Sequence, residues 1–160
     1  MKVIAVDGWI GTGFKPGAMS GPAKVLRAEG EWYVRKEGDA YGIRNADGGR
    51  NNSGAVYIEH VDGDKNYPYH ASGAKMAQLI GKIGKDGAAF AIGKYYKFRR
   101  GDFSKVGASE ELFLRINYPD EWMGPVHGHL DVDLKDSDDT DPFAVEEYFD
   151  RVAGRYVRVN

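Results

Sequence analysis

Short apolar segments alternate with polar, glycine-rich segments along most of this chain, and this pattern predicts β-strands. Within several segments apolar and polar residues alternate, so one face of each strand would be buried and the other exposed. Turn residues separate the segments by roughly 8–12 residues, the spacing typical of an all-β sandwich or barrel. The predicted strands are 3–6, 24–28, 55–60, 76–83, 88–92, 95–98, 112–116 and 129–134.

The end of the chain has a different pattern, which predicts an α-helix over 142–153. Asp141 and Pro142 suit the N-cap and the first helical position, and Gly154 suits the C-terminal end. Apolar residues between them fall at approximately helical spacing, namely Phe143, Val145, Tyr148, Phe149 and Val152. The expected fold is therefore an all-β β-sandwich with one C-terminal α-helix. The sandwich would span 1–134, with an acidic linker and the amphipathic helix, packed on the same domain, over 135–160.

The composition narrows the class of protein. The chain has 160 residues and no cysteine, which suits a single domain and excludes disulfides and thiol chemistry. No apolar run approaches the roughly 18 residues that a membrane span needs, and the N-terminus turns polar too early for a secretory signal. We therefore expect a soluble, cytoplasmic protein, unless another route exports it. The net charge of −2 gives no broad attraction for nucleic acid, so no nucleic-acid partner is expected.

Two groups of polar residues suggest chemistry but also have simpler interpretations. His127, His129, Asp131 and Asp133 share one face of a predicted strand, which is either a site for a divalent metal or a solvent-facing surface. The segment 131–150 carries nine acidic residues and one lysine, either paired with the mildly basic remainder or solvated.

The chain shows no motif for catalysis. Neither a nucleophile motif nor a P-loop occurs, so we expect a protein that is not an enzyme. Paired carboxylates for glycoside hydrolysis remain open, because their separation is a spatial property.

The order of several short phrases resembles a known family. From Gly73 the chain reads G-A-K-M-A-Q-L-I-G-K-I-G, then F-A-I-G, L-F-L-R-I-N and H-G-H-L-D-V-D-L. Nearer the N-terminus, Trp9 followed by Thr12-Gly13, and V-L-R-A-E-G-E-W ending at Trp32, fit the same order. These phrases resemble the calcium-dependent galactophilic bacterial lectins of the PA-IL type. The resemblance implies a galactose-binding jelly-roll sandwich that binds galactosides at a loop-bound calcium, and it implies homo-oligomers.

The loop that holds calcium in that family is altered here. In the aligned segment I-N-Y-P-D-E-W-M-G-P-V-H-G-H, Tyr118 replaces an aspartate, and Pro125 and Val126 replace two asparagines. Calcium needs several oxygen ligands, which these three side chains do not supply. A calcium site is therefore absent or rebuilt from Asp120 and Glu121. The family's N-N-S-G phrase occurs earlier, at 51–54 behind Asp47, where it would bind calcium or sugar or simply form a turn.

We expect a carbohydrate-binding, galactoside-type protein that holds sugar at its loop tips. Trp122 is the best stacking residue, because it lies in a Pro-bounded polar loop. The candidate sugar-binding residues are Asn51, Asn52, Tyr118, Asp120, Trp122 and His127. The candidate calcium ligands are Asp47, Asp120 and Glu121. The alternative is a protein-interaction module on a lectin scaffold that has lost its calcium site.

Overall fold

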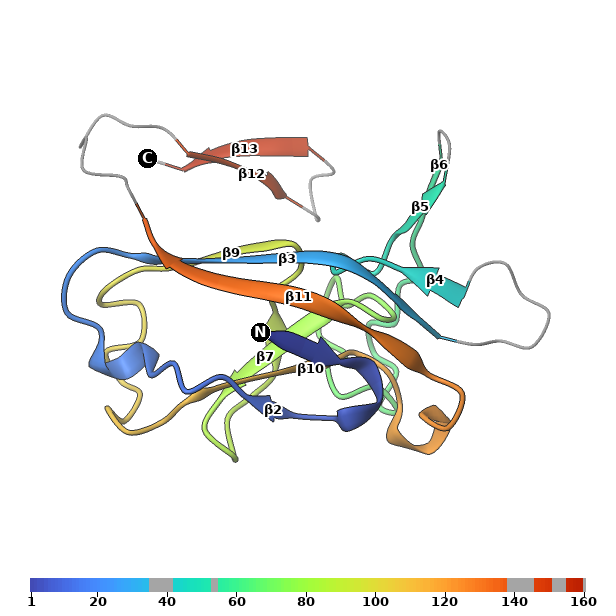
Figure 1. Cartoon of the computed structure of the whole chain (residues 1–160), viewed down its shortest axis with the longest axis horizontal. Coiled ribbons are helices and arrows are strands. Elements are labelled where there is room, and N and C mark those ends of the chain that lie inside the picture. The colour runs from blue at the N-terminus through green and yellow to red at the C-terminus, as the bar shows by residue number, and fades with distance from the viewer. Residues whose placement is uncertain (35–41, 53–54, 138–145, 151–154, 160) are drawn as a thin grey trace.

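A computed structural model describes residues 1–34, 42–52, 55–137, 146–150 and 155–159, and its main body is two antiparallel sheets packed together (Figure 1). The prediction of an all-β sandwich is therefore confirmed. No helix in these described ranges is long and apolar enough to cross a bilayer.

The first sheet is built around two long strands, β3 (Lys24–Tyr33) and β11 (His127–Asp136), which pair residue by residue along their whole length. β1 (Lys2–Ile4) pairs with β11 at one edge, and β4 (Ile43–Arg44) and β9 (Tyr95–Phe98) both pair with β3. The second sheet has the order β2 (Ile10–Gly11), β10 (Leu112–Ile116), β7 (Leu79–Ile83) and β8 (Phe90–Ala91).

Short 3-10 turns and two separate hairpins complete the elements of the described ranges. The 3-10 turns are η1 (Ala5–Asp7), η2 (Pro16–Ala18) and η4 (Asp120–Trp122). One hairpin joins β5 (Arg50–Asn52) to β6 (Ala55–Tyr57) and projects from the sandwich, while the other joins β12 (Glu146–Asp150) to β13 (Arg155–Val159) (Figure 1).

The core follows from alternation along the strands. On β11, Leu130 and Val132 are buried while Asp131 and Asp133 are exposed, so the predicted polar face is the outer surface of the sheet. Trp32 on β3 is fully buried, and its indole Nε1 donates a hydrogen bond of 2.8 Å to the carbonyl of Ala77. Side chains of both sheets thus meet in one apolar layer, which fixes the ends of the strands and the loops that leave them.

Individual strands match the predictions to different degrees. The predicted strands 95–98 and 112–116 have the observed bounds of β9 and β10. The first predicted strand ends early because the chain enters η1 and then turns at Gly8, whose φ is +68°. β11 extends to His127 and Asp136 because β3 offers a pairing partner at every position.

The predicted C-terminal helix is wrong over its central part. Glu146–Asp150 is strand β12, which pairs antiparallel with β13. Tyr148 and Phe149 favour strands, and the R-Y-V-R-V sequence of β13 alternates and supplies a partner, so pairing overrides the helical spacing. The other residues of the predicted helix, 142–145 and 151–153, lie outside the described residues.

Candidate functional site

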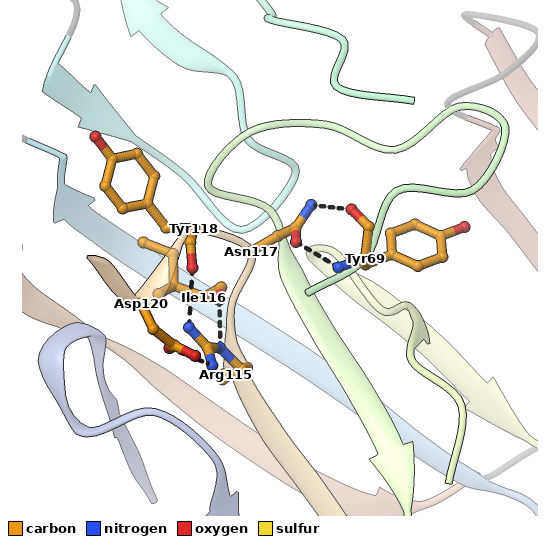
Figure 2. A network of polar contacts seen from close by, with 6 residues as sticks. All are labelled: Tyr69, Arg115, Ile116, Asn117, Tyr118 and Asp120. Carbon is orange, nitrogen blue, oxygen red and sulfur yellow. Dashed lines mark hydrogen bonds and ion pairs between the residues drawn. The ribbon is translucent and has the colours of Figure 1, made fainter. Parts of the chain in front are cut away.

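The loop after β10 is fixed at its start by a buried amide. The side chain of Asn117 is fully buried, and its Nδ2 donates hydrogen bonds of 2.9 Å to the carbonyls of both Tyr69 and Lys75. Its Oδ1 accepts a third bond of 2.9 Å from the backbone N–H of Tyr69 (Figure 2). All three bonds connect this loop to the segment 69–75, so Asn117 joins two loops that are distant in sequence.

A buried arginine holds the next part of the same loop. Arg115 lies on β10 with 3% of its surface exposed. Its Nε and Nη2 donate bonds of 2.9 Å to the carbonyls of Ile116 and Tyr118, and its Nη1 lies 2.9 Å from Oδ1 of Asp120 (Figure 2). The Trp9 ring covers the guanidinium, with its centroid 5.6 Å from Cζ. The planar group therefore fixes the backbone that leads into η4.

Three aromatic rings meet where η4 contacts the segment 59–67. Trp122 lies edge to face with Tyr67 at a centroid distance of 6.1 Å and with Tyr118 at 5.8 Å, and the two tyrosine rings are 6.3 Å apart. Tyr67 and Tyr118 are only 6% and 9% exposed, whereas Trp122 is 45% exposed. We call Tyr67, Tyr118 and Trp122 the aromatic triad. Two buried rings thus support one accessible indole, in the geometry that aromatic pairs prefer.

Carboxylates surround the two tyrosines and affect their ionisation. Burial raises the pKa of Tyr67 to about 12, and Tyr118, Asp64 and Glu59 add to the rise. Burial also raises the pKa of Tyr118, with a further rise from Glu59 and an opposing effect from Arg44. Both phenols therefore stay neutral at physiological pH, and each remains a hydrogen-bond donor.

The shift at Tyr67 predicts a late step in an alkaline titration. A phenol whose pKa is higher in the folded protein contributes stability that is complete below about pH 10 and is lost as the pH rises towards 12. An alkaline titration followed by tyrosinate absorbance should show one fewer late-ionising phenol in Tyr67→Phe. In unfolding measurements, the same variant should lose less stability above pH 10 than the original chain. Loss of an early-ionising phenol instead would contradict the assignment.

The structure brings together part of the predicted sugar site. Tyr118, Asp120 and Trp122 lie in or beside η4, and Glu121 is an exposed residue of the same turn. His127 does not belong to this turn. Its ring stacks on Tyr33 of β3, with centroids 4.7 Å apart and an interplanar angle of 11°. It therefore lies on the outer face of the first sheet, at the start of β11.

The other predicted loop is attached elsewhere. Oδ1 of Asp47 accepts a 2.9 Å hydrogen bond from the backbone N–H of Lys94, and Asp47 forms a β-bridge with Gln78. Asn51 and Asn52 are not in a loop but in strand β5, where they pair with Val56 and Ala55. These three residues belong to the β4–β6 region and its hairpin.

The candidate calcium ligands do not fit a calcium site. One oxygen of Asp120 faces Arg115, and one oxygen of Asp47 is used by Lys94. Across the described residues no group of three or more His, Cys, Asp or Glu side chains lies close enough together to hold an ion, so Asp47, Asp120 and Glu121 form no such group. Calcium needs six to eight oxygen ligands.

Several residues of this site are not indicated by sequence reasoning. Tyr67 and Asp64 lie in the segment 62–68, whose Gly, Asp and Pro residues indicate only a strand break, and Glu59 lies in the predicted strand 55–60. The sequence indicates Arg115 only in part. It is a base at an outward position of an apolar predicted strand, where it requires an acidic partner or solvent. A scan of protein-family models and a search of curated proteins both find no match to this chain.

Proposed function

We propose that this chain is a lectin-like, galactoside-type carbohydrate-binding protein, and that Trp122 is its main sugar contact. The observation that carries the proposal is the exposed indole supported by two buried tyrosines. The resemblance of the strand phrases to galactophilic jelly-roll lectins supports the same ligand class. The proposed activity is binding and not catalysis.

The geometry suits the two surfaces of a sugar. The ring C–H groups of a galactoside are apolar and pack on an aromatic face, while its hydroxyls need hydrogen-bond partners. Asp120 and Glu121, exposed beside Trp122, provide carboxylate acceptors. Hydrogen bonds to a charged acceptor are stronger than those between neutral groups.

The support beneath the loop reduces the cost of binding. Arg115 and Asn117 hold the backbone on both sides of Tyr118, so η4 is ordered before a ligand arrives. A site that is ordered in advance loses less conformational entropy on binding. One exposed ring provides only a small interaction energy with a sugar. A lower entropy cost therefore has a large effect on the affinity of this site.

A glycan array with calcium and with chelator tests the proposal. We expect binding to terminal galactosides of similar strength in both arms, because Asp47, Asp120 and Glu121 form no group that fits an ion. Binding that disappears with chelator would contradict this expectation and indicate a site rebuilt on binding. The absence of binding to any glycan in both arms would overturn the proposed function.

The second candidate is a protein-interaction module. β1 is an edge strand of the first sheet, and its last residue Ile4 and the flanking Met1 and Val6 are 40–49% exposed. An edge strand presents backbone donors and acceptors that pair readily with another strand, most simply with a second copy across a two-fold axis. Such a homo-oligomer would also raise the avidity of weak sugar sites. A silent array would favour this candidate.

A further inference from the structure

The accessible charges around the aromatic triad are mostly negative. The segment 59–67 contributes Glu59, Asp62 and Asp64 against Lys65, and 117–126 contributes Asp120 and Glu121 with no base. Asp120 and Glu121 are exposed, while Asp64 is half-buried and Glu59 partly exposed. A ligand on Trp122 therefore approaches a surface with an excess of carboxylates.

The two arginines beside the triad do not present their charge to solvent. Arg44 is fully buried with its Nη2 3.6 Å from Oε1 of Glu59. Arg115 is 3% exposed and faces Asp120 at 2.9 Å. A carboxylate on a ligand would therefore need to displace an existing ion pair, or enter a buried space, to reach either guanidinium.

We infer that the triad discriminates sugars by charge, taking neutral and amino sugars and rejecting uronic and other acidic sugars. This inference rests on the proposed carbohydrate-binding function. An ammonium group on the sugar gains attraction from Asp120, Glu121 and Asp64, whereas a sugar carboxylate meets an excess of like charge that one exposed base, Lys65, offsets only in part. A neutral galactoside lies between the two.

Three matched probes test the inference on the full chain at neutral pH. Polymer-linked galactosamine and galacturonate each differ from galactose at one position, the first by an ammonium group at C2 and the second by a carboxylate at C6. We expect galacturonate to bind about fivefold more weakly than galactose, and galactosamine at least as tightly, from the size of exposed charge interactions. The differences should shrink at high salt, because salt screens exposed charges.

Charge-neutralising variants identify the source of the discrimination. Glu121→Gln combined with Asp64→Asn keeps the size of both side chains, and the new amide at the second position retains an oxygen to accept the Asn66 N–H. We expect the ratio of galactose to galacturonate affinity to fall by about half or more when these two carboxylate charges, one exposed and one half-buried, are removed. Asp86→Asn, an exposed acid in the β7–β8 turn, should leave the ratio unchanged.

The outcomes distinguish a failure of this inference from a failure of the proposed carbohydrate-binding function. Binding of none of the three probes overturns the proposed function, and the inference with it. Equal binding of galactose and galacturonate, or a ratio that the double variant leaves unchanged, overturns the inference alone and keeps the sugar site. A ratio that falls only in the double variant supports both.

Discussion

Trp122→Ala is expected to weaken galactoside binding at least tenfold, which corresponds to about 1.4 kcal/mol, while the chain stays folded. The indole is the one accessible ring of the triad, so its removal takes away the apolar surface on which a sugar would pack. Trp122 is 45% exposed, and Arg115 holds the backbone that leads into η4 at the carbonyl of Tyr118, so we expect the chain to fold without the indole. Titration with a galactoside probe measures the loss, and a thermal melt checks the fold.

Two further variants make this result specific. Trp122→Phe keeps an aromatic face of smaller area and should bind with intermediate affinity. Tyr95→Ala removes a half-buried aromatic ring from the first sheet, where it stacks with Arg27, and should leave binding unchanged. Normal binding by Trp122→Ala would exclude the triad as the sugar contact.

Asn117→Ala is expected to lower the free energy of unfolding by about 3 kcal/mol. The substitution removes three hydrogen bonds of 2.9 Å, two of them at the backbone N–H and carbonyl of Tyr69 and one at the carbonyl of Lys75, which keeps a longer bond of 3.5 Å from the N–H of Gln78. A buried group that loses its partner costs about 1–3 kcal/mol, and water can reach the half-buried Tyr69 more easily than Lys75. Denaturant titration followed by far-UV circular dichroism measures the change.

Matched substitutions show whether the hydrogen bonds of Asn117 or the volume of its side chain contributes the stability. Asn117→Asp keeps the acceptor for the N–H of Tyr69, but it loses both donors and buries a carboxylate, so we expect a loss as large as that of alanine. Asn66→Ala, in an exposed turn, should change stability by no more than about 0.5 kcal/mol. A small effect of Asn117→Ala would mean that the two loops are held together by other contacts.

Most of the sandwich could be predicted from alternation, because burial of one strand face is a local property of the sequence. Leu112–Ile116 and Tyr95–Phe98 show this, since their apolar positions alone give the observed bounds. The C-terminal segment could not be predicted in the same way. Tyr148 and Phe149 fit both a helical stripe and a strand, and the choice depended on pairing with Arg155–Val159.

Of the two segments that form the candidate site, only the one that contains η4 could be predicted from the sequence. Trp122 and Asp120 are visible as exposed residues of a Pro-bounded loop, and the structure places them in η4. Tyr67, more than fifty positions earlier, supports Trp122 through a contact that no local pattern encodes. Asp47 illustrates the opposite error, because its carboxylate resembles a ligand in the sequence but binds the backbone of Lys94.

The pairing of β1 with β11 has a consequence for synthesis of the protein. The amino group of Met1 donates to the carbonyl of Val132, so the first residues find their partner 131 positions later. β3 likewise pairs along its whole length with β11. On the ribosome, β1 and the edge of β3 that pairs with β11 therefore stay unpaired until His127–Asp136 has emerged. The first sheet should therefore form only after β11 has been synthesised, and chains truncated before β11 should be prone to aggregation.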